Sequence, residues 1–260
     1  MRLAVILLPM LASVGHLSAQ SQKSVNLELT KEIREGVDAW PLIAHPKDSI
    51  ERRVNAALVQ LNNDLRKTLD GCDADVAEFN GQSGTAEPGK NSTPDDWSRR
   101  IEVTMTGPRF LSMIARDDFF CGGAHPDDNR TVVVFDLQTG EMVDWASFLA
   151  KESGATSEKN VLGDAGGTTP PLAFAGLQPL YADAEVDDCK DIFAEPQSFL
   201  LWPDAKSGTV VAEVTGLSHV GAPCKVDFKM RLDQARKLGF DETLLGAIAL
   251  AHLQFAKGSH

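Results

Sequence analysis

Basic residues are scarce in this sequence, which has 25 Lys and Arg side chains against 37 Asp and Glu and a formal net charge of −12 at pH 7. A surface of this charge repels nucleic acid and anionic lipid and attracts basic partners. Long apolar runs are also few. The run at residues 3–12 is shorter than the roughly 20 residues of a membrane-spanning helix, and no later stretch qualifies. We therefore expect no nucleic-acid partner and no membrane span.

The motifs of common catalytic sites are missing. The chain has no phosphate-binding loop, no dinucleotide-binding glycine motif, no HExxH and no Gly-x-Ser-x-Gly. Ser218 and His219 are adjacent, but neighbours on an extended chain point in opposite directions. An acidic group around Cys189 fits no EF-hand loop and is interpreted as a solvated surface; its members are Asp183, Glu185, Asp187, Asp188 and Asp191. The sequence predicts no metal and no cofactor.

Cysteine occurs four times, as Cys72, Cys121, Cys189 and Cys224. No CxxC spacing exists, so neither a zinc ribbon nor a thioredoxin-like site is supported. In an oxidising compartment an even number of cysteines indicates disulfides, and four of them allow three pairings. We favour Cys72 with Cys121 and Cys189 with Cys224, because each bond then closes a moderate loop within one half of the chain.

The N-terminus has the pattern of a secretory signal peptide. Arg2 precedes the apolar run, and the small residues Ser18 and Ala19 suit a cleavage site. We therefore expect residues 1–19 to be removed. No cysteine follows the cleavage region, so a lipoprotein anchor is not expected. The mature protein is predicted to be periplasmic or secreted.

The spacing of apolar residues predicts an α+β protein. Strands are expected at 24–30 and 40–44, before a long amphipathic helix that Asp48 caps and that ends near Gly71 and Cys72, with a loop over residues 73–96. Strands at 97–106, 109–120 and 131–137 have connections too short for parallel crossovers. They should form an antiparallel meander with the long helix on its apolar face.

The second half reads as another antiparallel sheet. After a short helix capped by Asp144 we expect a loop at 151–171, a helical stretch at 172–193, strands at 198–202, 209–214 and 225–231, a short helix from Asp233 to Gly239 and a terminal helix at 241–255. The fold is thus predicted as antiparallel sheets in two closely packed halves. Residues 20–144 form the first half, 145–240 the second, and 241–260 an appended helix and tail.

The most specific pattern lies between residues 119 and 144. Gly122-Gly123-Ala124-His125 follows one predicted strand, and Phe135-Asp136-Leu137-Gln138-Thr139-Gly140 ends the next. The glycines suit a turn or bulge with positive φ. We expect His125 to tie that turn to the sheet. Asp136 should accept hydrogen bonds from turn amides.

The order of these pieces resembles the RsiV/PdaC-type extracytoplasmic domain, which is found in a lysozyme-sensing anti-sigma factor and in the N-terminal region of a peptidoglycan deacetylase. The likeness covers roughly residues 25–239. Besides the two motifs it includes Trp40 to Ile43, Val54-Asn55 and the segment from Gly216 to Arg231. The anti-sigma segment and the deacetylase motifs have no counterpart here. The resemblance therefore implies a free-standing copy of the module.

What the resemblance implies is a non-enzymatic binding module of the bacterial cell envelope. The partner would be a basic protein such as lysozyme or a related muramidase. Gly122, Gly123, His125 and Asp136 are the candidate binding-surface or motif residues, and we expect a monomer. Two alternatives stay open. One is a module that binds peptidoglycan glycan, and the other is a hydrolase with a site near His125, where neighbouring carboxylates could serve a metal or acid–base chemistry.

Overall fold

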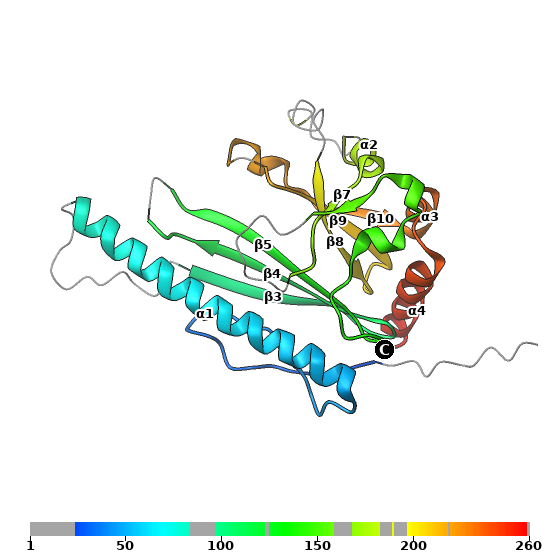
Figure 1. Ribbon diagram of the computed structural model, residues 1–260, viewed down its shortest axis with the longest axis horizontal. Coiled ribbons are helices and arrows are strands. Elements are labelled where there is room, and N and C mark those ends of the chain that lie inside the picture. The colour runs from blue at the N-terminus through cyan, green and yellow to red at the C-terminus, as the bar shows by residue number, and fades with distance from the viewer. Residues whose placement is uncertain are drawn as a thin grey trace, which may run out of the picture.

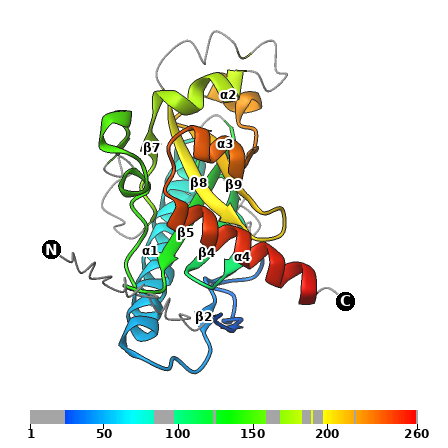
Figure 2. The same ribbon diagram turned by 90° about the vertical axis from the view of Figure 1, so that its right-hand side faces the viewer.

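The computed structural model describes residues 24–83, 97–122, 125–158, 168–182, 189, 197–217 and 219–258. Helix α1 lies along one face of a three-stranded sheet, and a second, five-stranded sheet covers the other face (Figure 1). Helix α3 contacts β9 and helix α4 contacts β8 (Figure 2). The α+β class predicted from the sequence is confirmed. The predicted signal peptide lies outside the described residues.

The N-terminal elements pack on helix α1, Ser49–Ser83. Strands β1, Leu27–Glu28, and β2, Leu42–Ile43, pair antiparallel and are shorter than the predicted extended segments. The Asp48 carboxylate accepts a hydrogen bond from the Glu51 amide at 2.9 Å, which is the predicted cap. One side of the helix is buried against the sheet, through Val54, Leu58, Leu61 and Leu65.

Helix α1 continues past the point where the sequence prediction ended it. The predicted helix end near Gly71 is wrong, and so is the predicted loop over residues 73–83, because these residues are helical. The buried residues Leu69, Cys72 and Val76 extend the helical spacing of the earlier leucines. Gly71 itself lies on the exposed side. Tertiary packing of the buried side outweighs the low helix propensity of the glycine and aspartates on the exposed side.

The meander prediction is confirmed. Strands β3, Trp97–Thr106, β4, Phe110–Phe119, and β5, Asp127–Asp136, pair antiparallel in the order β3-β4-β5. Strand β5 begins four residues earlier than predicted, because its polar start pairs with the polar end of β4. Both faces are buried over residues 110–115 of β4 and 132–136 of β5, which explains the nearly continuous apolar runs there. The side chains on the α1 side include Met113 and Val133, and those on the opposite side include Ile114 and Val132.

The second sheet has the strand order β10-β9-β8-β7-β6, and all its pairs are antiparallel. The elements of this half are η2 (Trp145–Phe148), η3 (Lys151–Ser153), β6 (Thr156–Ser157), β7 (Leu172–Ala173), η4 (Ala175–Leu177), α2 (Gln178–Ala182), β8 (Ser198–Asp204), β9 (Thr209–Thr215), η7 (His219–Cys224), β10 (Phe228–Arg231), α3 (Leu232–Lys237) and α4 (Glu242–Gly258). The predicted helical stretch at 172–193 is wrong at its start, because β7 pairs with β8.

The two halves share one large apolar core. The Asp144 carboxylate caps η2 by accepting a hydrogen bond from the Ala146 amide at 3.0 Å, as predicted. This cap places the fully buried Trp145 between the meander and the second sheet. Helix α4 joins the same core through Leu244, Leu245 and Ile248. The terminal helix is therefore packed into the fold.

The two disulfides join Cys72 to Cys121 and Cys189 to Cys224, the pairing favoured from the sequence. Disulfides of this kind are typical of oxidising compartments. Among the helices in the described part of the chain, none has the length and apolar character needed to cross a bilayer.

Candidate functional site

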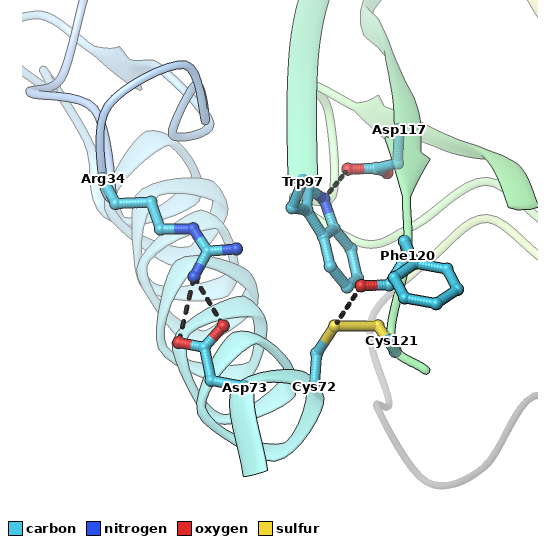
Figure 3. The surroundings of a disulfide bond; sticks show 7 residues. All are labelled: Arg34, Cys72, Asp73, Trp97, Asp117, Phe120 and Cys121. Carbon is cyan, nitrogen blue, oxygen red and sulfur yellow. Dashed lines mark hydrogen bonds and ion pairs between the residues drawn. A yellow bond between two sulfur atoms is a disulfide. The ribbon is translucent and has the colours of Figure 1, made fainter. Parts of the chain in front are cut away.

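The sequence motif that begins at Cys121 is fixed to the C-terminal half of α1. Cys72 on the helix bonds Cys121 just after β4, with their Cα atoms 4.7 Å apart (Figure 3). Gly122 follows with φ +86°, and a Cβ there would lie 3.3 Å from Cβ of Phe79 and 3.4 Å from the carbonyl oxygen of Asp75. Positive φ and this close approach both explain a glycine. Gly123 and Ala124 lie outside the described residues.

This end of the molecule carries exposed carboxylates and an aromatic pair. The rings of Phe79 and Phe120 meet edge to face, 6.1 Å apart, and Phe79 is 40% exposed. Two of the carboxylates pair with bases, Asp73 with Arg34 at 3.0 Å and Asp128 with Lys225 at 3.2 Å. We call the exposed set the acidic tip; it comprises Asp70, Asp73, Asp75 and Glu78 of α1, Asp118 of β4, and Asp127 and Asp128 of β5.

His125 lies on the acidic tip and is exposed. Its Nδ1 lies 3.0 Å from the carbonyl oxygen of Pro126. Asp127 and Asp128 follow it at the exposed start of β5. Within the described ranges, no three His, Cys, Asp or Glu side chains gather as a metal site would require. The geometry therefore presents His125 as a surface group beside two carboxylates.

Asp136 lies at the opposite end of β5. The strand has 10 residues, which at about 3.3 Å per residue separates the two motif segments by about 30 Å. The Asp136 carboxylate accepts hydrogen bonds from the Gln138 amide at 2.8 Å and from the Arg109 guanidinium at 2.8 Å and 3.0 Å. The predicted bond to a turn amide is confirmed. The two motif segments belong to different ends of the molecule and do not form one site.

A pocket that the sequence did not reveal lies between α1 and the meander and extends to residues 168–171 and to Leu200 of β8 and Thr215 of β9. Its volume is about 220 Å³. Leu61, Asp64, Leu65 and Thr68 of α1 line one side, and β3 and β5 contribute Trp97, Arg99, Asn129 and Thr131. The lining combines indole and leucine surface with hydroxyl, amide and carboxylate groups. Such a combination is typical of sites for small ligands.

A buried ion pair supports the floor of this pocket. Arg99 and Asp117 have side chains 5% and 2% exposed, and Nη1 of Arg99 lies 3.2 Å from the Asp117 carboxylate. The same carboxylate accepts a hydrogen bond from the Trp97 indole at 2.9 Å (Figure 3). Burial lowers the pKa of Arg99 and raises the pKa of Asp117, and each charge opposes the shift of the other. The guanidinium also lies over the Trp40 ring, 5.0 Å from its centroid.

A second ion cluster joins the meander to the second sheet. Arg130 of β5 contacts the carboxylates of Glu213 on β9 and Asp227 before β10. Its guanidinium lies over the Trp202 ring at 5.5 Å. Burial raises the pKa of Glu213 to about 7, although the Arg130 charge opposes this shift. The residues of this cluster are far apart in sequence, so no local pattern predicts it.

The pKa of Glu213 predicts a pH-dependent stability. Because the folded-state pKa of about 7 exceeds the ordinary 4.5, the stability from protonated Glu213 is fully present below about pH 4.5 and is lost as the pH rises through about 7. Glu213→Gln stays neutral at every pH. Between pH 5 and pH 8, urea unfolding should therefore show wild type losing about 2–3 kcal/mol relative to this variant. Parallel pH profiles of the two proteins would contradict the assignment.

Comparison of the sequence with models of known protein families and with curated proteins gives no match. The resemblance to the RsiV/PdaC-type domain thus stays a prediction from its motifs. Other candidates from the sequence, Ser218 and the acidic group from Asp183 to Asp191 apart from Cys189, lie outside the described residues. The candidate sites considered below are the acidic tip and the pocket.

Proposed function

We propose that the protein is a non-enzymatic, periplasmic or secreted binding module of the bacterial cell envelope whose partner is a basic muramidase of the lysozyme type. The observation that carries this proposal is the acidic tip. It groups exposed carboxylates of α1, β4 and β5 at the end of the molecule where Phe79 is partly exposed. Opposite charge steers a basic protein toward such a surface and fixes its orientation.

The tip is also held rigidly, which favours binding. The Cys72–Cys121 disulfide fixes the end of β4 to α1, and Gly122 lies close to Phe79 of the same helix. A surface held in this way loses little conformational entropy when a partner docks. A single copy presents the whole tip, so the proposal needs only a monomer.

The hydrolase alternative has less support. The exposed His125 is absent from the lining of the pocket between α1 and the meander. A catalytic site there would need a second group to position the substrate. We therefore favour a binding role for the motif segment that contains His125. The glycan-binding alternative would use the pocket.

Charge reversal on the tip should weaken lysozyme binding. For Asp75→Lys we expect the Kd for hen-type lysozyme to rise by about 5- to 10-fold at low salt, measured by titration calorimetry. Glu141→Lys is the matched control. It makes the same change of net charge at an exposed site near the other end of the meander, where the Glu141 carboxylate lies 2.6 Å from Nη1 of Arg53.

Two outcomes would count against the proposal. Absence of binding by the wild type at low salt would remove the muramidase partner. Equal weakening by Asp75→Lys and Glu141→Lys would show that net charge alone attracts lysozyme and that the tip is no specific surface. A lysozyme activity assay on the complex then decides whether binding also covers the cleft of the enzyme and inhibits it.

A further inference from the structure

The pocket between α1 and the meander is a small built site that the tip proposal does not use. Its volume of about 220 Å³ lies below the range of about 300–1,000 Å³ typical of drug-sized ligands. It can therefore hold one ring and not an extended chain of rings. Leu61 and Leu65 from α1 and Trp97 from β3 give this space apolar surface.

The charges that line the pocket are already compensated within the protein. Arg99 pairs with Asp117 at 3.2 Å, and Lys67 pairs with Asp64 at 2.8 Å. Arg130 contacts two carboxylates, those of Glu213 and Asp227. Because each of these charges has an opposite neighbour, the pocket gives no net attraction to an anion or a cation. The ligand that suits it is neutral.

The pocket nevertheless offers many hydrogen-bonding groups. Asp64 supplies acceptor oxygens, and the hydroxyl of Thr131 supplies both a donor and an acceptor. Arg99 is buried, and its Nε–H has no acceptor among the residues that the structure describes. A buried donor without a partner is costly, and Arg99 lines the pocket, so a ligand oxygen that reached this donor would add to affinity.

We propose that this pocket binds one neutral sugar ring of the N-acetylhexosamine type. The ring hydroxyls match the polar groups on α1 and β5, and the apolar face of the ring matches the leucine and indole surface. The acetamido group adds a carbonyl acceptor for Arg99, an N–H donor for Asp64 and a methyl group for Leu65. This site shares no residue with the acidic tip, and its test does not require muramidase binding.

Titration with N-acetylglucosamine tests this assignment. Proton–nitrogen NMR should show saturable shifts of the Trp97 indole signal at roughly millimolar ligand. Thr68→Phe places a large side chain at the exposed rim of the pocket and should weaken binding at least 10-fold. Asn63→Phe is the control, since Asn63 is exposed on the same helix and does not line the pocket.

The outcomes separate this proposal from the tip proposal. Binding that is lost in Thr68→Phe and kept in both Asn63→Phe and Asp75→Lys supports the pocket. Absence of saturable shifts with N-acetylglucosamine would overturn it, and so would binding that Thr68→Phe leaves unchanged. Tighter binding of glucose 6-phosphate than of N-acetylglucosamine would also overturn it, because the ligand would then be an anion.

Discussion

Asp117→Ala is expected to lower the free energy of unfolding by about 3–5 kcal/mol, the cost of leaving a buried charge without its partner. Asp117 is 3% exposed, and its carboxylate is bonded to both the Arg99 guanidinium and the Trp97 indole. Removing it leaves Arg99 buried beneath α1 without its opposite charge. Urea unfolding followed by far-UV circular dichroism measures the loss.

A double variant separates the cost of an unpaired buried charge from the cost of lost packing. Arg99→Met with Asp117→Leu removes both charges and keeps most of the side-chain volume. We expect this double variant to be more stable than Asp117→Ala alone, because apolar replacements of a buried pair are often nearly neutral. A loss below about 1 kcal/mol in Asp117→Ala would contradict the role of the ion pair, since it is smaller than the cost of one unsatisfied buried group.

Removing the Cys72–Cys121 disulfide is the second change with a large expected effect. The bond spans a sequence separation of 49, and the loop-entropy model gives it about 4 kcal/mol. The double variant Cys72→Ala/Cys121→Ala should lose about this much in urea unfolding. It should also weaken lysozyme binding, because the acidic tip depends on the attachment of β4 to α1.

Hydrogen exchange gives the local test of the same variant. Amides in the last part of α1, residues 73–81, should exchange faster, because this part loses its covalent link to the sheet. The control is Cys189→Ala/Cys224→Ala, which opens a loop with a sequence separation of 35 in the other half of the chain. Equal exchange at residues 73–81 in both variants would show that the first disulfide does not fix this end of the helix.

Much of the fold follows from local patterns in the sequence. Short connections between alternating strands predict the antiparallel meander, and loop lengths favour the two disulfides that the structure shows. The caps at Asp48 and Asp144 also follow from residue type, because a carboxylate before a helix accepts its orphan amides. The strands and caps depend on residues close together in the chain, and the disulfides close loops within one half of it.

The sequence contains a pattern that predicts the C-terminal part of α1, although the predicted helix ended earlier. The spacing from Leu65 through Leu69 and Cys72 to Val76 is helical, and all four side chains are buried. Gly71 and the aspartates that follow it suggested a loop. The buried face decides the outcome, because packing supplies most of the stability of a helix in a folded protein.

The pocket and the two ion clusters were beyond local sequence patterns. Arg130 and Glu213 are 83 positions apart in the chain, and both become neighbours only when β5 packs against the second sheet. Arg99 and Asp117 face each other through the register of β3 and β4. The local sequence does not show whether such charged side chains are buried. It therefore cannot tell a buried pair from two solvated side chains.

Hydrogen exchange of the wild-type protein with and without hen-type lysozyme at low salt tests the central claim most directly. We predict a complex in which protection increases at residues 70–79 of α1 and at residues 118–122, which are the end of β4 and the segment after it. The far end of the meander around Asp136 should stay unchanged. Absence of any change in protection, or protection confined to the far end, would contradict the acidic tip as the binding surface.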